Sequence, residues 1–427
     1  MLTKEQNEIL TRVDGDAPMG QLMRENYWFP FALSSQLEPG DAPFMVRLLG
    51  RNHIALRAPD GRIGFFDENC PHRGASLALA RVEQGGHLRC IFHAWEFDIN
   101  GNATDCPTEP PERAAAFCSR VKLNRYPVHE AGGLIWVWLG SGDAPAFPNL
   151  PFVGALEENT FLTVSVGQCN WLQGVEGTLD SAHIGTLHKT WISGIADRNK
   201  GNIGMSLDGP PQYDSDLTDY GLRAAALRPL TGGKTYARIT EYMMPFICLA
   251  PSNGTRGQEG VIFIISPVDD EHHLMFFGLY SDREKQDPVA AAIQPEGGRC
   301  DHFNYAPLPG GREDRWGQDR ALMKAGHFTG FGNNILEEDM VVQASMGPIV
   351  DRTREFLSAT DIAIVNTRRM LLAALEDFAA GNLPPGSARR GEPVVLPGPI
   401  DVVVEAGRSW KDVVDLPVPT RRKSERL

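Results

Sequence analysis

The chain has 427 residues, of which 42% are hydrophobic and 22% charged, and its formal net charge at pH 7 is −13. This composition is ordinary for a soluble globular protein with two or three domains, and the acidic balance argues against nucleic acid or an anionic membrane surface as a partner. No apolar run approaches the roughly 20 residues that cross a bilayer, and the polar N-terminus has no apolar signal-peptide core, so we expect a cytoplasmic protein.

The first third of the chain is predicted to be a short helical segment followed by a small all-β domain. Residues 1–40 are a helical lead-in that ends at the turn Pro39-Gly40. Residues 41–145 contain short strands, with a hairpin turn at Pro59-Asp60-Gly61 and a buried strand over 132–138. The Gly- and Pro-rich segment 140–151 is expected to link this domain to the next.

The rest of the chain is predicted to be a larger α+β domain over residues 152–385. A helix-like run covers 173–188, strands follow to about residue 280, and 282–315 is a loop excursion. A last helix begins near Thr360 and ends at Gly381, with Ile364, Leu371, Leu375 and Phe378 on one face. Such a helix would pack across a curved sheet. Residues 386–427 form a basic, proline-rich tail to which we assign no structure.

Two short motifs place cysteine beside histidine in the first domain. Cys70 and His72 form C-x-H, and Cys90 and His93 form C-x-x-H, each in a loop between strands. Two thiolates and two imidazoles are the ligand set of a Rieske [2Fe–2S] cluster. A structural zinc site is the alternative, but zinc sites usually pair Cys with Cys and His with His. The seven cysteines fit metal ligation better than a disulfide framework.

The segments CPHRGASL and CIFHAWEFDINGN resemble the Rieske domain of ring-hydroxylating oxygenases. That family commonly has glycine after the second histidine, where this chain has Ala94. The change leaves all four ligands in place but affects the local loop.

A second constellation lies about 100 residues downstream, in the run NWLQGVEGTLDSAHIGTLH. On a helix Glu176, Asp180 and His183 share a face, whereas His183 and His188 are five residues apart, about 140° around an ideal helix. Both histidines can reach one metal only if the helix bends or ends between them, for which Gly185 is well placed. Two histidines and a carboxylate with open positions form the facial triad of non-haem Fe(II) oxygenases. The alternative is a pair of surface histidines on an acidic helix.

This part of the chain is similar to the phthalate dioxygenase branch of the same family, whose catalytic domain is helix-grip-like. The similarity covers MLTKEQNEILTRV, NWLQGVEG and EEDMVVQASMGPIVDRTREFLSATDIA. It implies that Asp339 is the third iron ligand, although Glu337 and Glu338 compete by chemistry alone. It also implies that Asp180 is a carboxylate bridge to a cluster histidine of a neighbouring subunit, in a homotrimer or a stacked hexamer.

The substrate site is less well specified. The branch carries a substrate-binding arginine where this chain has Arg238 in TYARITEYMMPF, although a structural or solvent-facing role is an alternative. A second arginine of the phthalate enzymes has no clear match in this chain, and Arg198 is only a loose candidate. This departure from the phthalate pattern favours an aromatic monoacid as the substrate.

The resemblance implies an oxygenase that uses O₂ and electrons from NAD(P)H to oxygenate an aromatic acid, by ring dihydroxylation or by monooxygenation such as O-demethylation. The expected cofactors are a [2Fe–2S] cluster and Fe²⁺. No G-x-G-x-x-G fingerprint follows a strand, so the reductase is expected to be a separate polypeptide. The alternative is a Rieske electron carrier whose second domain binds a hydrophobic ligand.

Overall fold

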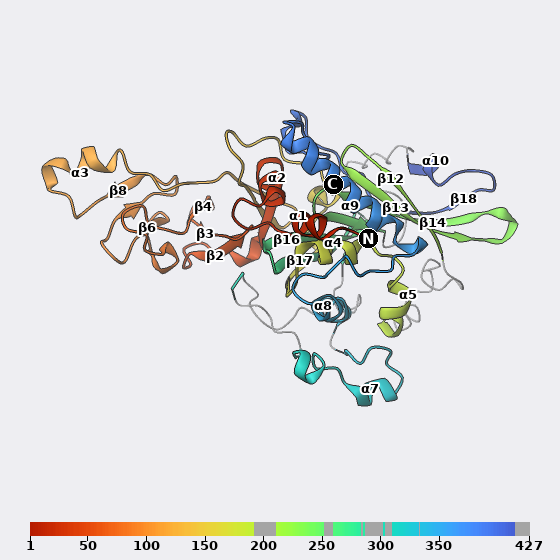
Figure 1. Ribbon diagram of the computed structural model, residues 1–427. Coiled ribbons are helices and arrows are strands. Elements are labelled where there is room, and N and C mark those ends of the chain that lie inside the picture. Colours follow the sequence, from red (N-terminus) through yellow and green to blue (C-terminus); the bar gives the residue numbers. More distant parts are fainter. Residues whose placement is uncertain are drawn as a thin grey trace, which may run out of the picture.

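The computed structural model describes residues 1–191, 211–251, 259–282, 285–286, 302–303, 310–332 and 334–414. In Figure 1 a β-rich domain extends to one side of a larger body built of a broad sheet with helices. The expected excursion over 282–315 lies largely outside the described residues, and Arg198 lies wholly outside them.

The chain begins with two short helices, α1 (Lys4–Thr11) and α2 (Pro18–Asn26). Thr3 starts α1 with a capping box, and a proline occupies the first turn of α2, where its missing N–H costs nothing. Both helices contact the long helix α9 (Ile362–Ala379) of the larger domain. The N-terminal segment is therefore packed onto a domain whose first strand, β11, begins more than 100 residues later in the chain.

The N-terminal domain is built of three small antiparallel sheets and one helix, α3 (Pro111–Cys118). The Pro59-Asp60-Gly61 turn joins two strands as expected, with Gly61 at φ 87°, a value that glycine adopts without strain. The sheets are β1-β10-β9 (Trp28–Leu33, Leu134–Trp138, Val128–Ala131), β2-β3-β4 (Phe44–Leu48, Arg51–Arg57, Ile63–Asp67) and β5-β6-β7-β8 (Arg81–Glu83, His87–Arg89, Glu96–Phe97, Ala103–Asp105).

The larger domain is organised around one antiparallel sheet, which has eight strands among the described residues. Its order is β11-β17-β16-β15-β14-β13-β12, and β18 pairs with β14 beside β15. The strands are β11 (Thr160–Gly167), β12 (Gln212–Leu217), β13 (Gly221–Pro229), β14 (Thr235–Met243), β15 (Ile247–Ala250), β16 (Glu259–Asp269), β17 (His272–Ser281) and β18 (Ile400–Val404).

Strand β18 lies in the tail after residue 386, to which the sequence analysis assigned no structure. β15 pairs only with the C-terminal end of β14, so the N-terminal half of β14 would keep unpaired backbone groups. β18 pairs with that half, and its Ile400 and Val404 are buried with Trp410 in a separate apolar cluster. The short helix α10 (Lys411–Val414) completes this cluster.

Helices α4 (Trp171–Leu179) and α9 pack on the sheet, and α8 (Ile335–Ser345) packs against α4. The expected C-terminal helix from Thr360 to Gly381 is confirmed as α9, with Leu371 and Leu375 buried. Two shorter helices are α5 (Ile184–Leu187), which follows α4, and α7 (Arg320–Lys324), which precedes α8. The architecture is the expected α+β arrangement. Of the described helices, none combines the length and apolar character that crossing a membrane requires.

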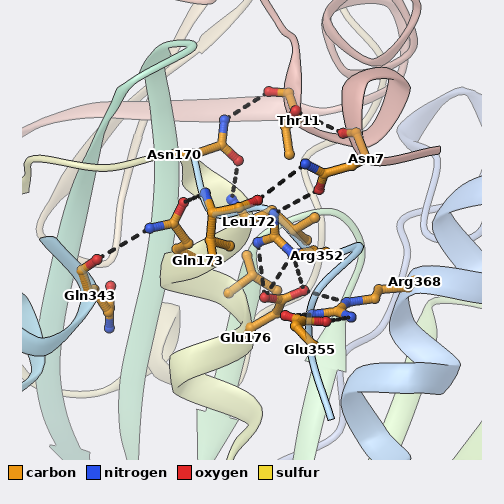
Figure 2. A network of polar contacts seen from close by, with 12 residues as sticks. Asn7, Thr11, Asn170, Leu172, Gln173, Glu176, Gln343, Arg352, Glu355 and Arg368 are labelled. Carbon is orange, nitrogen blue, oxygen red and sulfur yellow. Dashed lines mark hydrogen bonds and ion pairs between the residues drawn. The ribbon is translucent and has the colours of Figure 1, made fainter. Parts of the chain in front are cut away.

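A buried ionic network fixes α4 in place (Figure 2). Arg352, fully buried, donates to both carboxylate oxygens of Glu176, and Arg368 of α9 donates to one of them at 2.7 Å. Burial raises the pKa of Glu176, but the two arginines outweigh it and hold that pKa below its usual value. Arg352 also contacts Asn7 of α1, and Arg368 contacts Glu355. Glu176 therefore serves the packing of α1, α4 and α9, and does not join the candidate metal site of its helix.

Candidate functional site

The two cysteine–histidine motifs fold into loops with the same backbone pattern. The N–H of Cys70 donates to the carbonyl of Ala75 at 2.8 Å, and the N–H of Gly74 donates back to the carbonyl of Cys70 at 2.9 Å. In the second loop Cys90 donates to Trp95, and Ala94 donates to Cys90, both at 2.9 Å. One loop follows β4 and the other joins β6 to β7, so the two turns present equivalent positions.

The four predicted ligands of these loops lie together. The rings of His72 and His93 are 4.5 Å apart between centroids, and His72 stacks on Trp95 at 4.3 Å. Cys70 and Cys90 are 2% and 3% exposed. Burial raises the pKa of the Cys70 thiol, and the neighbouring Cys90 raises it further. Backbone hydrogen bonds oppose both effects, and the resulting pKa is about 11.

These side chains fit an iron–sulfur cluster. Two adjacent buried thiols become thiolates only beside a strong positive charge, which cluster iron supplies. Nδ1 of His93 is buried and has no hydrogen-bond partner in the described part of the chain, an uncompensated polar atom that metal ligation would satisfy.

The backbone explains why family members carry glycine at position 94. Ala94 lies in the left-handed region at φ 59°, and Gly74 occupies the matching place in the other loop at φ 75°. We expect Ala94→Gly to stabilise the domain by about 0.5–1 kcal/mol. Glycine removes the steric strain of the Ala94 Cβ in the left-handed region, and this gain exceeds the extra conformational entropy that glycine loses on folding. The measurement is the midpoint for thermal loss of the cluster's visible absorption. Gly74→Ala is the matched control and should lower that midpoint, since its Cβ would meet no atom within 4 Å and only the backbone would be strained.

The second candidate site brings together His183, His188 and Asp339. Oδ1 of Asp339 lies 3.5 Å from Nε2 of His183 and 3.2 Å from Nε2 of His188, and one ligand atom from each residue lies within 4.8 Å of the others. Helix α4 ends at Leu179, and α5 runs between the two histidines. The break therefore covers residues 180–183, before α5 begins, and does not lie at Gly185 as the sequence suggested.

Two further carboxylates hold the opposite nitrogens of these histidines. Oε2 of the fully buried Glu338 lies 2.7 Å from Nδ1 of His188, and Thr329 donates its hydroxyl to the other oxygen of Glu338. Oδ2 of Asp180 lies 3.5 Å from Nδ1 of His183. Histidine metal ligands usually donate their second N–H to such a group, which turns the free nitrogen toward the metal. Both Nε2 atoms here face Asp339.

The electrostatics of this site favour a cation. Burial lowers the pKa of His188, but hydrogen bonds to Asp339 and Glu338 outweigh it and raise that pKa to about 9. Burial raises the pKa of Asp180, but hydrogen bonds from His183 and from the backbone hold it below its usual value. The cluster thus has excess negative charge that attracts a proton or a metal ion. A divalent metal held by two imidazoles and one carboxylate is the arrangement of a non-haem Fe(II) site.

A cavity of about 150 Å³ opens onto the three side chains. A cavity of this size holds a single benzene ring. Its walls are mainly apolar, from Ile184, Ala250, Val261, Phe263, Met275, Phe277, Ile335 and Leu336. Arg238 of β14 also lines it. The side chain of Arg238 is 7% exposed, and neither a hydrogen bond nor an ion pair to it is found in the described ranges.

Comparison with known proteins agrees with both sites. Residues 27–127 match the model of the Rieske [2Fe-2S] domain, and residues 137–418 match the LigXa C-terminal domain like family. The oxygenase subunit of phthalate 4,5-dioxygenase from Pseudomonas putida is 36% identical over 96% of this chain and 94% of its own. The oxygenase subunit of 3-chlorobenzoate-3,4-dioxygenase from Comamonas testosteroni is 35% identical, over 90% and 91%.

The chain belongs to the Rieske non-haem iron oxygenases. Another relative, the oxygenase subunit of 5,5'-dehydrodivanillate O-demethylase from Sphingobium sp., is 30% identical over 90% of this chain and 83% of its own. The fold is that of the terminal oxygenase of carbazole 1,9a-dioxygenase from Novosphingobium sp. KA1, with a TM-score of 0.56 at 21% identity, over 85% of this chain and 96% of that one.

Membership fixes the cofactors of this oxygenase as a [2Fe–2S] cluster and a mononuclear iron, and it means that electrons come from a separate donor. The sequence had not distinguished a role for Glu338 beyond competition with Asp339. Adjacent residues on a helix point about 100° apart, so Glu338 and Asp339 reach different nitrogens of His188. Two adjacent carboxylates on a helix, one for each nitrogen of a histidine, are a signal that the sequence contains, but it can be read only if a helix is expected at these residues.

Proposed function

We propose that this oxygenase uses O₂, and electrons from NAD(P)H delivered through a separate reductase, to oxygenate an aromatic acid. The reaction is ring dihydroxylation or monooxygenation such as O-demethylation. The observation that carries the proposal is the ring-sized apolar cavity with the histidine–carboxylate cluster on one wall and the unpaired Arg238 on another. The relatives named for phthalate and 3-chlorobenzoate support an aromatic acid as the substrate class.

In this proposal Cys70, His72, Cys90 and His93 hold the cluster. His183, His188 and Asp339 hold the iron, which activates dioxygen when electrons arrive. Glu338 and Asp180 orient the two histidines from behind, and Asp180 is in addition the bridge to the cluster.

Electron transfer is proposed to cross between subunits. In Figure 1 β6, which precedes Cys90, lies on the left in the β-rich domain, whereas α5, which follows His183, lies on the right of the larger body. A second cavity, lined by no residue of β14, also reaches Asp180 and Asp339. Val342 and Met346 at its wall are exposed. Leu79, Ile91 and Phe92 are exposed around the cysteine–histidine loops. Two different surfaces that meet head to tail close into a ring, which supports a homotrimer or a stacked hexamer.

A cytoplasmic location remains part of the proposal. The six cysteines in the described part of the chain are all free, which agrees with a reducing compartment.

The proposal is tested by product analysis with ¹⁸O₂, a surrogate reductase and a panel of aromatic acids. Incorporation of two labelled atoms into the ring indicates dihydroxylation, and incorporation of one atom or loss of a methyl group indicates monooxygenation. Iron content separates the alternative function, because an electron carrier with a ligand-binding domain would hold about two irons per chain and the oxygenase about three. Two irons with no labelled product from the panel would contradict the proposal.

Arg238→Gln is expected to raise KM for an aromatic acid by about 10-fold or more and to leave KM for the matching amide nearly unchanged. Arg238 is the charged donor on the cavity wall, and a charge-assisted hydrogen bond contributes about 1.5–3 kcal/mol. Steady-state kinetics with an acid and its amide check this, the amide serving as the control. An equal change for both substrates would show that Arg238 is structural.

A further inference from the structure

Two further cysteines of the N-terminal domain lie at the two ends of a surface excursion. Cys106 follows β8, and Cys118 is the last residue of α3, which lies at the far left end of the β-rich domain in Figure 1. We call residues 106–118 the α3 excursion. Between the two cysteines every residue is exposed or half-buried, whereas Cys106 is 0% and Cys118 8% exposed. The excursion is therefore anchored in the domain by the two cysteines at its ends.

The backbone brings these two cysteines together. Asn102 and Lys122 form an antiparallel bridge, and the same register, followed from this bridge toward the excursion, leads to Cys106 on one side and Cys118 on the other. Helix α3 contacts β8, and both cysteines belong to one buried apolar cluster. Burial raises the pKa of the Cys106 thiol, and a hydrogen bond with Cys118 raises it further, to about 12. The two thiols are therefore in contact, and both are free.

The α3 excursion also holds Trp95 from two sides. The indole N–H of Trp95 donates to the hydroxyl of Thr108 at 2.9 Å, and its ring meets the ring of Phe117 edge-on, 5.4 Å between centroids. The same indole stacks on His72, a proposed cluster ligand, at 4.3 Å. Thr108 and Phe117 are close neighbours of the two cysteines in the chain. How firmly the ends of the excursion are held therefore decides how firmly Trp95 is held on His72.

Buried cysteines often serve only as small apolar side chains, and that is the alternative for this pair. Two observations argue for more. The two thiols contact each other across a short loop, which is the arrangement that a disulfide requires. The loop between them has few buried side chains, and such segments open locally at a low free-energy cost, which gives a small oxidant access to the sulfur atoms.

We propose that Cys106 and Cys118 form a redox modification site, which hydrogen peroxide converts into a disulfide that holds the α3 excursion over Trp95. The thiolate of Cys118, the more exposed of the two, attacks one peroxide oxygen. An S–O bond forms, the O–O bond breaks, and the departing hydroxide takes up the proton that the thiol released, which gives water and a sulfenic acid.

The second step closes the loop. The sulfur of Cys106 attacks the sulfenic sulfur of Cys118, so that the S–S bond forms and the S–O bond breaks. The oxygen leaves as a second water with the proton of Cys106. In total the two thiols lose two electrons, which reduce one hydrogen peroxide to two waters. The site does not depend on the substrate or the reaction of the larger domain, because it involves only the Rieske domain.

The disulfide is expected to make the cluster more stable. A cross-link between the ends of a loop removes conformations from the unfolded and opened states, so the excursion would stay closed for longer. Thr108 and Phe117 would then remain on Trp95, and the indole would remain on His72. Reduction by a dithiol such as dithiothreitol should reverse the effect.

The first test detects the bond itself. The holoenzyme is treated with dithiothreitol or with a small molar excess of hydrogen peroxide, then denatured in an alkylating agent and digested with trypsin without reductant. Trypsin cleaves after Arg113, between the two cysteines, so a disulfide keeps the two peptides joined. We expect joined peptides after peroxide treatment and separate, alkylated peptides after dithiothreitol. Cys118→Ala should give no joined peptides. Cys169→Ala is the matched control, because it removes a buried thiol of the larger domain, and it should behave as the wild type.

The second test measures what the bond does, after the peroxide or the dithiothreitol has been removed. The midpoint for thermal loss of the cluster's visible absorption should be about 5 °C or more higher for the disulfide form than for the dithiol form. This difference should vanish in Cys118→Ala and persist in Cys169→Ala.

Each result decides for or against the site. If both cysteines of the wild type are alkylated after peroxide treatment, the inference is wrong, and this conclusion needs no variant, so it holds even if Cys118→Ala does not fold. Joined peptides with equal midpoints in the two forms would overturn the proposed hold on Trp95. A midpoint difference of the same size in Cys118→Ala would assign the effect to another oxidised group and would also overturn it.

Discussion

Asp339→Ala is expected to lose the mononuclear iron and all oxygenation while it keeps the visible spectrum of the [2Fe–2S] cluster. Oδ1 of Asp339 is the oxygen that faces Nε2 of both His183 and His188. Alanine removes this ligand atom and offers no replacement. The cluster loops draw their side chains from the other domain, so the loss should stay local. Iron analysis should fall from about three to about two atoms per chain.

Glu338→Gln is the comparison that separates an iron ligand from a residue that only orients a ligand, because Glu338 contacts the opposite nitrogen of His188 from Asp339. The amide oxygen can still accept a hydrogen bond from Nδ1 of His188, but it lacks the charge that strengthens this contact. Loss of such an outer partner typically costs about 10- to 100-fold in metal affinity, so iron should remain bound at high iron concentration and dissociate on dilution. Glu337→Gln is the neighbouring control, since Glu337 is not among the three residues that converge. Full iron in Asp339→Ala together with iron loss in either glutamine variant would reassign the third ligand.

The competition between these three acidic residues marks a limit of sequence reasoning. Local spacing was sufficient to select the four candidate cluster ligands and the two candidate iron-binding histidines, because the members of each pair are only two to five residues apart. The proposed third iron ligand, Asp339, comes from a helix about 150 residues after His188. Which of three consecutive carboxylates faces the histidines depends on where α8 begins, at its cap Asn334, and on how it packs against α4. Only the family resemblance selected Asp339 in advance.

The helix break near His183 was expected, but at the wrong residue. Gly185 was favoured because glycine weakens helices, yet it lies inside α5. The chain instead leaves the helix at Asp180, whose Oδ1 accepts the N–H of Ala182 at 2.7 Å. Asp and Ser at 180–181 stabilise turns through such side-chain contacts, and this signal was present in the sequence.

Long-range strand pairing was the part that the sequence did not reveal. Strand β18 follows a proline-rich segment and has only five residues, so its pairing with β14 depends on an edge formed elsewhere in the chain. The direction of Arg238 likewise depends on the register of β14 against its neighbours, and a shift of one residue would turn it to the opposite face.

Asp180→Asn is expected to leave both metal centres occupied and to slow single-turnover oxidation of the pre-reduced cluster by about 100-fold. The triad of His183, His188 and Asp339 is complete without Asp180, so iron should remain. Hydrogen bonds from His183 and the backbone outweigh burial and hold the pKa of Asp180 below its usual value, so the ionised form is favoured, and an ionised carboxylate can accept hydrogen bonds on both oxygens. Asp180 lies behind His183 and lines both the substrate cavity and the second cavity.

A carboxylate in this position can accept one hydrogen bond from Nδ1 of His183 and another from a histidine that enters through the second cavity. Asparagine has nearly the same shape but presents an acceptor on one side and a donor on the other. One of the two contacts must therefore fail, while the backbone contact to Ala182 and the fold survive. The proposed path between cluster and iron would be interrupted at this residue.

The measurement is rapid mixing of the reduced holoenzyme with substrate and O₂, followed by the absorbance of the oxidised cluster. Asp361→Asn is the matched control, because Asp361 lines the same second cavity and, within the described part of the chain, makes no hydrogen bond or ion pair to the triad. Its amide oxygen can still accept the capping bond from the N–H of Ser358. It should oxidise at the wild-type rate. If Asp180→Asn also oxidises at that rate with full iron, Asp180 is an ordinary helix-end carboxylate. The proposed bridge would then be wrong, and the case for electron transfer between subunits would lose the residue that supports it.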